Sequence, residues 1–277
     1  MQRVQVRSGM NSQWVELDGN PGRPFQTVAA SGLRFSKNGK RLAYPVRIDP
    51  AWAANEKRLW AVHNHNHETT RFWRGIGSLA LSDDGNHLAY SAQVKNGWRV
   101  VLNGKAGPVF AGVSDLMFSA DANTLVYVAG SKKGQSIVIN HVPGRRYPAI
   151  AALEVGPRGQ RIAAIVRHNR RWHVSDNGLL GPPHQAIDAL FLSKDGQNLA
   201  VIVRDNTGAR VIFNGKSGEY FDKIRRASFH FSDVGKPVYI GGRNGLDYPV
   251  HGEEIGAGYA RLDPPVTAGK RIAYIAH

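Results

Sequence analysis

The sequence predicts an all-β fold built from one four-stranded unit that recurs along the chain. The first observation is a series of two-residue turn signals at Asp18-Gly19, Asn66-His67, Asn103-Gly104, Asn140-His141, Asn177-Gly178, Asn214-Gly215 and His251-Gly252. From Asn66 onward, successive turns are 37 residues apart. Because Asn-Gly and its relatives tolerate the positive φ angles of a tight hairpin, the series indicates one such hairpin per repeat.

A second series of turns is offset from the first by 18 to 21 residues and supports the same repeat. Its members are Gly39, Gly85, Gly159, Gly196, Gly235 and Gly269, with Ala122 in the third repeat. Several follow a Ser-x-Asx sequence, whose polar side chains can satisfy the backbone of the turn. Three residues after each turn position an aliphatic residue recurs: Leu42, Leu88, Leu125, Ile162, Leu199, Val238 and Ile272.

Two residues beyond each aliphatic residue lies Tyr44, Tyr90, Tyr127, Ala164, Val201, Ile240 or Tyr274. The intervening residues are mostly small and apolar, so these strands are expected to be buried on both faces. Each unit then contains four short strands: one before the Ser-x-Asx turn, the apolar strand after it, one ending at the Asn-Gly turn, and an edge strand such as Pro108-Val109-Phe110.

Seven such sheets packed face to face around an axis would bury the apolar faces that a single sheet leaves open. The sequence therefore predicts a seven-bladed β-propeller with four-stranded antiparallel blades, as one domain over residues 1–277. A solenoid would need polar capping units, whereas the last unit is as apolar as the others. The seventh blade is expected to be shared between the N- and C-termini. Residues 3–6 and 272–275 both align with its second strand, and the alignment leaves open which one completes it.

The repeat sequences resemble a known family. Residues 35–44 (FSKNGKRLAY), 81–90 (LSDDGNHLAY) and 192–201 (LSKDGQNLAV) are similar to the WD40-like repeat of TolB-type β-propellers. The resemblance extends through all seven units and implies the propeller fold. It does not imply a particular activity, because such repeats serve in binding modules, in envelope proteins and beside peptidase domains.

The composition places few limits on location. No apolar run reaches about 18 residues, so no transmembrane helix is expected. The chain has no cysteine, which excludes disulfides, thiolate metal sites and cysteine nucleophiles but fits the cytoplasm and the periplasm equally. The first residues lack the apolar segment of a signal peptide, so a periplasmic location would require a signal that has been removed. A monomer is expected.

The charge is strongly basic, with 36 Lys and Arg against 21 Asp and Glu and a formal net charge of +15. The loops between second and third strands should share one face with the interblade loops, and they are rich in basic residues. The same loops also include Arg7, Arg167 and Arg210. The candidate binding residues are Arg47, Trp52, Lys57, Arg58, Lys95, Arg99, Lys132, Lys133, Arg170, Arg171, Arg204 and Arg243. Such a face could hold anionic groups, although basic loop tips are also ordinary solvated surface.

One insertion interrupts the repeat, because Asp18 and Asn66 are 48 residues apart. The extra residues lie around positions 45–58, in a predicted second-to-third loop of the basic face. Loops longer than the repeat requires are common places for binding function. Trp52 is the candidate there, flanked by basic residues; alternatively, its ring closes the end of the central channel.

Residues 63–68 (HNHNHE) raise a metal hypothesis. Alternation along a strand would place His63, His65 and His67 on one side, where neighbouring imidazoles could share a transition metal. Against this, His67 aligns with turn positions such as His141. No cofactor is otherwise expected, and no nucleophile elbow, phosphate loop or zinc-protease motif occurs.

These observations favour a non-catalytic binding module that recognises an acidic protein, an acidic peptide or an anionic polymer, of which nucleic acid is one, through the basic face. The alternative is an enzyme or metalloprotein with its site at the channel mouth or on the His63/His65 strand. A basic module that docks within a larger assembly is a third interpretation. The steep salt dependence of polyanion binding would distinguish the first from the second.

Overall fold

The computed structural model describes residues 3–48, 59–64, 67–68, 71–269 and 271–277. These form two compact units, Met1–Arg146 and Tyr147–His277, which are described separately. The regular structure consists of strands and two short 3-10 helices, η1 (Ala30–Gly32) and η2 (Arg226–Ser228). No helix in the described ranges is long and apolar enough to cross a membrane.

Unit 1 contains four antiparallel sheets. The first is β1 (Val4–Ser8), β2 (Gln13–Leu17) and β3 (Asn20–Pro21); the second is β4 (Thr27–Val28), β5 (Arg34–Phe35), β6 (Leu42–Ile48), β7 (Leu59–Asn64) and β8 (His67–Glu68). The third is β9 (Gly75–Leu81), β10 (Leu88–Val94), β11 (Gly97–Leu102) and β12 (Lys105–Phe110); the fourth is β13 (Gly112–Phe118), β14 (Leu125–Ser131), β15 (Gly134–Ile139) and β16 (Val142–Tyr147), whose last residue belongs to unit 2.

Unit 2 repeats the pattern. One sheet is β17 (Ala149–Val155), β18 (Ile162–His168), β19 (Arg171–Asp176) and β20 (Leu179–Leu180), and the next is β21 (Ala186–Leu192), β22 (Leu199–Asp205), β23 (Gly208–Phe213) and β24 (Lys216–Ser217). They are followed by β25 (Lys223–Ile224), β26 (His230–Phe231), β27 (Pro237–Arg243), β28 (Leu246–His251) and β29 (Glu254–Ile255), and by the pair β30 (Val266–Ala268) and β31 (Arg271–Ala273).

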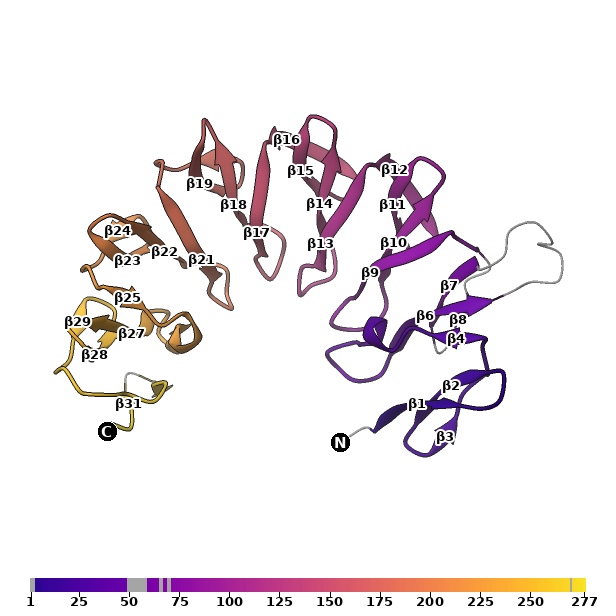
Figure 1. Ribbon diagram of the computed structural model, residues 1–277, viewed down its shortest axis with the longest axis horizontal. Helices are drawn as coiled ribbons and strands as arrows, with labels where there is room; N and C mark the ends of the chain where they lie inside the picture. The colour runs from indigo at the N-terminus through magenta and orange to yellow at the C-terminus, as the bar shows by residue number, and fades with distance from the viewer. Residues whose placement is uncertain (1–2, 49–58, 65–66, 69–70, 270) are drawn as a thin grey trace. The chain divides into compact units, whose positions relative to one another are not determined.

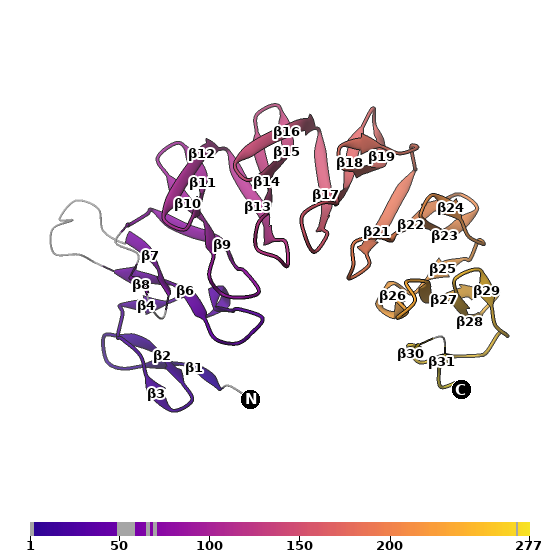
Figure 2. The ribbon, with the colours of Figure 1, turned by 180° about the vertical axis from the view of Figure 1, so that it is seen from behind.

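Each complete sheet is a simple meander in which consecutive strands are neighbours, as β17 to β19 show in Figure 1. Seen from behind in Figure 2, β9 and β12 form the two edges of their sheet, with β10 and β11 between them. The prediction of repeated four-stranded antiparallel units is confirmed. The apolar second strands are buried on both faces, as the five buried residues from Leu88 to Ala92 illustrate. They are buried because the second strand of each sheet has a neighbouring strand on either side and apolar contacts on both faces of the sheet.

The turn predictions are confirmed at most positions. The predicted pair Asn66-His67 is an exception, because His67 lies in β8 and pairs with Asn64. Asn103 and Gly104 have φ angles of 47° and 80°, which are the left-handed values of a two-residue hairpin turn. The Asn103 side chain also accepts a hydrogen bond from the backbone N–H of Leu88 at 3.0 Å. At the second turn series, Ser82 Oγ donates to Asp84 Oδ1 and accepts from the backbone of His87. The two turn series are therefore held by side chain to backbone bonds that recur from unit to unit.

The structure corrects the predicted register of the sixth unit. The amide of Gly252 donates to the carbonyl of Pro237, which is the bond that Asn103 makes with Leu88 elsewhere. The turn position is therefore Gly252 rather than His251. Consequently Tyr239, paired with Val250, takes the place that the sequence assigned to Ile240.

Further details refine the expectation. The first strand of two sheets is interrupted by a 3-10 turn, η1 or η2. Among the described residues, the edge strand is continuous over six residues only in β12 and β16. The segment from Pro45 to Ile48 belongs to β6 and not to a loop. Both candidate terminal strands are paired, each with its own neighbour: β1 lies beside β2, and β31 lies beside β30. Residues 49–58 connect β6 to β7 but lie outside the described ranges.

Candidate functional site

A column of aromatic side chains lies between consecutive sheets within each unit. At most of these interfaces, an aromatic residue at or just after the end of the edge strand packs against the tyrosine on the second strand of the next sheet. In unit 1 the ring centroids of Phe110 and Tyr127 are 6.2 Å apart in an edge-to-face arrangement, and Trp73 Nε1 donates to the hydroxyl of Tyr90 at 3.3 Å. In unit 2 the same geometry joins Phe221 to Tyr239. Such pairs combine a large buried area with favourable ring geometry.

Two places in the chain lack the complete pair. Where Ala164 replaces the tyrosine, the preceding Tyr147 is buried, and its hydroxyl lies 3.4 Å from Oγ of Ser175, the strand partner of Ala164. At the next interface, His184 stands in the aromatic column, 37 residues after Tyr147, and faces a sheet whose corresponding residue is Val201.

This substitution leaves a groove of about 970 Å³ between the β17–β20 sheet and the β21–β24 sheet, which we call the large groove. Its apolar wall consists of Val174, Leu199, Val201, Val203 and Ile212, which belong to the hydrophobic core between the two sheets. At the following interface, where Phe221 and Tyr239 are both present, the cavity has only about 360 Å³. The larger volume accompanies the replacement of the phenylalanine and the tyrosine by the smaller side chains of His184 and Val201.

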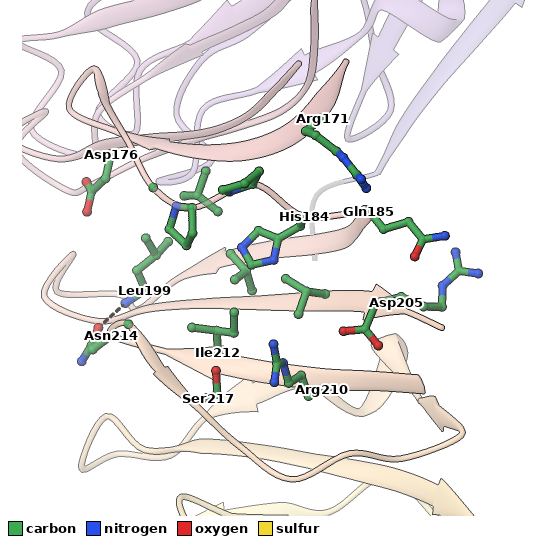
Figure 3. Close-up of a pocket in the computed structure, with 18 of the residues that line it drawn as sticks. Arg171, Asp176, His184, Gln185, Leu199, Asp205, Arg210, Ile212, Asn214 and Ser217 are labelled. Carbon is green, nitrogen blue, oxygen red and sulfur yellow. Dashed lines mark hydrogen bonds between the residues drawn. The ribbon is translucent and has the colours of Figure 1, made fainter. Parts of the chain in front are cut away.

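The two ends of the large groove differ in charge. Figure 3 shows Arg171, Gln185 and Asp205 at one end and Asp176 and Asn214 at the other. At the second end, Arg161 forms a two-pronged ion pair with Asp176, with Nη2 2.7 Å from Oδ2 and Nε 3.1 Å from Oδ1. Its Nη1 also donates to the carbonyl of Gln197 in the next sheet at 2.6 Å. The charge at this end is thus satisfied internally, and the arginine ties the two sheets together.

The other end carries cationic groups that no carboxylate neutralises directly. In the part of the chain that the structure describes, neither Arg171 nor Arg210 forms an ion pair. The guanidinium of Arg210 lies 4.6 Å from the centroid of the Tyr220 ring, and its Nε is buried without a hydrogen-bond acceptor. Stacking on an aromatic face restrains the guanidinium while leaving its in-plane N–H groups available.

Tyr220 is fixed in turn by Asp205, which accepts a hydrogen bond from its hydroxyl at 2.8 Å. That bond, together with the backbone amide of Thr207, holds the pKa of Asp205 below its ordinary value. The carboxylate is therefore ionised and already has two donors. It supports the ring beneath Arg210 and contributes a compensating negative charge near the arginine.

His184 adds a titratable group to the large groove. Burial lowers the pKa of its imidazole below 6.5, and the nearby charges of Arg210 and His173 lower it further, against an opposing effect of Asp205. The ring is consequently neutral at neutral pH. In this state it offers one N–H donor and one acceptor nitrogen.

The structure brings two of the candidate binding residues, Arg171 and Arg204, to the large groove. Arg204 is occupied there by a two-pronged ion pair with Asp188, at 2.9 and 3.0 Å. Arg243 stacks on Phe221 and Tyr248, with distances of 5.5 and 5.1 Å to the ring centroids.

The remaining candidates are spread over other elements. Lys95, Lys132, Lys133 and Arg170 are exposed in second-to-third turns, as predicted. Five of the described candidates lie in strands and not in loops, which corrects the prediction: Arg47 in β6, Arg99 in β11, Arg171 in β19, Arg204 in β22 and Arg243 in β27. Nε of Arg47 donates to Gln26 Oε1, and Nε of Arg99 is buried. Trp52, Lys57 and Arg58 lie outside the described residues.

The histidine strand is only partly described. The ring of His63 packs between Phe25 and Tyr44, with centroid distances of 5.0 and 5.2 Å. His65 and the side chain of His67 are outside the described part. No group of three His, Cys, Asp or Glu residues arranged to hold a metal occurs among the described residues. The metal hypothesis stays a prediction.

Sequence reasoning missed His184 and Val201, although a signal existed. The tyrosine column shows Val201 as an exception, and the aromatic positions Trp73, Phe110, Tyr147, His184 and Phe221 are each 37 residues apart. Val201 is the exception in the tyrosine column, and His184 is the exception in the aromatic column. They indicate a site only when the two columns are known to face each other, and this is known only from the packing of neighbouring sheets.

Comparison with known proteins gives similarity of fold alone. No protein-family model matches the chain, and no curated protein matches its sequence. Among solved structures, the chain is 12% identical to TolB from Acinetobacter baumannii, with a TM-score of 0.40 and coverage of 74% of this chain and 58% of that one. The chain thus spans less than two thirds of that protein.

Two further structures are described as propeller domains. The β-propeller domain of the Trilobed protease from Pyrococcus furiosus is 12% identical, with a TM-score of 0.47 and coverage of 89% and 88% of the two chains. The β-propeller domain of Cps50 (Swd1) from Myceliophteria thermophila is 13% identical, with a TM-score of 0.39 and coverage of 100% and 96%. The chain resembles propellers at the level of fold.

Proposed function

We propose that the chain is a non-catalytic binding module that recognises an acidic protein or peptide at the Arg171/Arg210 end of the large groove. The observation that carries this proposal is a preformed groove of about 970 Å³ whose cationic end has two arginines without ion pairs. Anionic groups are favoured there because a charge-assisted hydrogen bond to a restrained guanidinium is stronger than a neutral one. The apolar wall favours a ligand with carbon-rich side chains over a bare polyanion.

The test is binding of a fluorescein-labelled octaglutamate peptide, measured by anisotropy at low and high salt. Arg210→Gln and Arg171→Gln should each weaken binding about tenfold to 150-fold, because a hydrogen bond to a charged group contributes roughly 1.5–3 kcal/mol. Arg158→Gln is the matched control, since Arg158 is an exposed arginine in a turn of the same sheet, away from the groove. Binding that is unchanged in both groove variants would refute the assignment.

We also propose that the repeated units form a single seven-bladed ring over residues 1–277, with the terminal sheets together making the seventh blade. Support comes from the seven turn pairs in the sequence and from the incomplete terminal sheets, β1–β3 and β30–β31. Because the chain has no native cysteine, Val6→Cys and Ile272→Cys in one chain can carry a donor and an acceptor fluorophore. Efficient energy transfer between the two labels is expected, and transfer as weak as in the urea-unfolded chain would contradict ring closure.

A further inference from the structure

The large groove occupies the place where other interfaces of this chain hold a tyrosine packed against an aromatic residue. Tyr44, Tyr90, Tyr127 and Tyr239 each contact an aromatic residue of the preceding sheet, namely Phe25, Trp73, Phe110 and Phe221. At the large groove the tyrosine is replaced by Val201 and its partner by His184, while the surrounding strands keep the same pairing. The space of an aromatic side chain is therefore left open inside an otherwise regular interface.

The wall of this space remains apolar and is already in place. Val201 and Val203 are almost completely buried, and Leu199 and Ile212 are partly exposed toward the groove. A planar ring entering here would remove apolar surface from water on the strand side and contact the imidazole of His184 on the other side. Since the imidazole is neutral at neutral pH, it can stack or accept a hydrogen bond without a cost in charge burial.

The cationic group, Arg210, lies at a fixed distance along the strand from this space. Val201 pairs with Ile212, and Val203 pairs with Arg210, so all four side chains lie on the same face of the sheet. Arg210 is thus displaced by two residues along the strand from the position of the absent tyrosine. Two residues of extended chain span roughly 6.6 Å. In an extended ligand, side chains at positions i and i+2 point the same way with the same spacing.

From this juxtaposition we infer that the large groove binds an extended peptide segment in which an aromatic residue and an acidic residue are separated by one residue. The aromatic side chain fills the space of the absent tyrosine, against Val201 and His184. The carboxylate reaches Arg210, with Arg171 as a second cation at the mouth. The inference rests on the proposed function and specifies the ligand class for the same site.

The experiment uses the whole chain and four fluorescein-labelled pentapeptides: Glu-Ser-Tyr-Ser-Glu, Glu-Ser-Ala-Ser-Glu, Gln-Ser-Tyr-Ser-Gln and Ser-Glu-Tyr-Glu-Ser. The first should bind at least tenfold more tightly than the second, because burying an aromatic side chain contributes roughly 1.5–3 kcal/mol, or tenfold to about 150-fold. It should also bind more tightly than the third, which lacks the carboxylates, and the fourth, in which the acids are adjacent to the tyrosine.

Val201→Tyr is the decisive variant, because it restores the side chain that other interfaces carry at this position. It should fold as stably as the native chain and should bind the Tyr and Ala peptides equally, since the groove is filled while Arg210 is unchanged. If Val201→Tyr does not fold, Ile212→Phe blocks the same wall from the neighbouring strand.

The outcomes separate the inference from the proposed function. Equal binding of the Tyr and Ala peptides to the native chain, with both lost in Arg210→Gln, overturns the aromatic inference and leaves the anionic site intact. Failure of every acidic peptide to bind overturns both. Preference for the Tyr peptide that survives in Val201→Tyr places the aromatic group elsewhere and also overturns the inference.

Discussion

If the aromatic pairs fill the gaps between sheets, removing one pair should create a second large groove in unit 1. The pair Phe110 and Tyr127 is suited to this test, because Tyr127 is completely buried and its ring meets Phe110 edge to face at 6.2 Å. Phe110→His with Tyr127→Val reproduces the residues found at His184 and Val201. The two single variants and the double variant form a thermodynamic cycle.

The expected magnitudes follow from burial. Tyr127→Val removes a fully buried ring and should lower the free energy of unfolding by about 2–4 kcal/mol, by analogy with other large-to-small core substitutions. Phe110→His alters a half-buried residue and should cost about 1–2 kcal/mol. The loss of the ring contact itself should appear as a coupling of about 0.5–1.5 kcal/mol. Tyr127→Phe removes only the hydroxyl, which lies 3.2 Å from His141 Nδ1, and should lower the free energy of unfolding by about 1 kcal/mol or less.

Urea denaturation monitored by tryptophan fluorescence and by circular dichroism gives these values, provided that the two probes report coincident transitions with an unchanged m-value. Single costs below about 0.5 kcal/mol and no coupling would refute the reasoning, because the rings would then not be holding neighbouring sheets together. The same result would remove the explanation given for the large groove.

Three further predictions concern the interface, the turns and the site. Arg161→Ala should lower the free energy of unfolding by about 1–3 kcal/mol, since it breaks the ion pair with Asp176 and a bond to the next sheet, and thermal denaturation measures the loss. The hydrogen bond from Ser82 lowers the pKa of Asp84 below 3.8 in the folded chain. The ionised carboxylate therefore stabilises the folded chain above pH 3.8, and this stabilisation is lost as the pH falls through the pKa of Asp84 in the folded chain. Ser82→Ala should make the free energy of unfolding less sensitive to acid in denaturation curves. A carboxylate held by Arg210 should raise the lowered pKa of the nearby His184, so octaglutamate should bind more tightly as pH falls below neutrality, and His184→Phe should abolish the trend in anisotropy titrations.

Much of the fold could be predicted because turns and strand alternation are local properties. The left-handed angles at Asn103 and Gly104 follow from the residues themselves, and the buried second strands follow from apolar residues on both faces. The register of the sixth unit could not be fixed in this way. His251 and Gly252 form as good a turn signal as Gly252 and Glu253, and only the strand pairing of Tyr239 with Val250 distinguishes the two.

For the basic residues, too, one part could be predicted from the sequence and another depends on the tertiary structure. Their abundance and their positions in turns could be counted, but whether a guanidinium is available depends on its neighbours. Arg204 lies in an ion pair with Asp188, Arg243 lies on two aromatic rings, and Arg210 stacks on Tyr220 with a buried Nε that has no acceptor. Availability is set by distances of a few ångströms between strands, which the sequence does not specify.

The sequence by itself determined that this chain repeats one antiparallel unit, where its turns lie and which strands are buried, because those features depend on backbone preferences and on alternation over a few residues. Only the tertiary structure decided where a ligand can enter. His184 and Val201 are modest departures in two separate columns of the sequence. They become a groove because the packing of neighbouring sheets places them across one interface, where neither side chain is large enough to fill the gap.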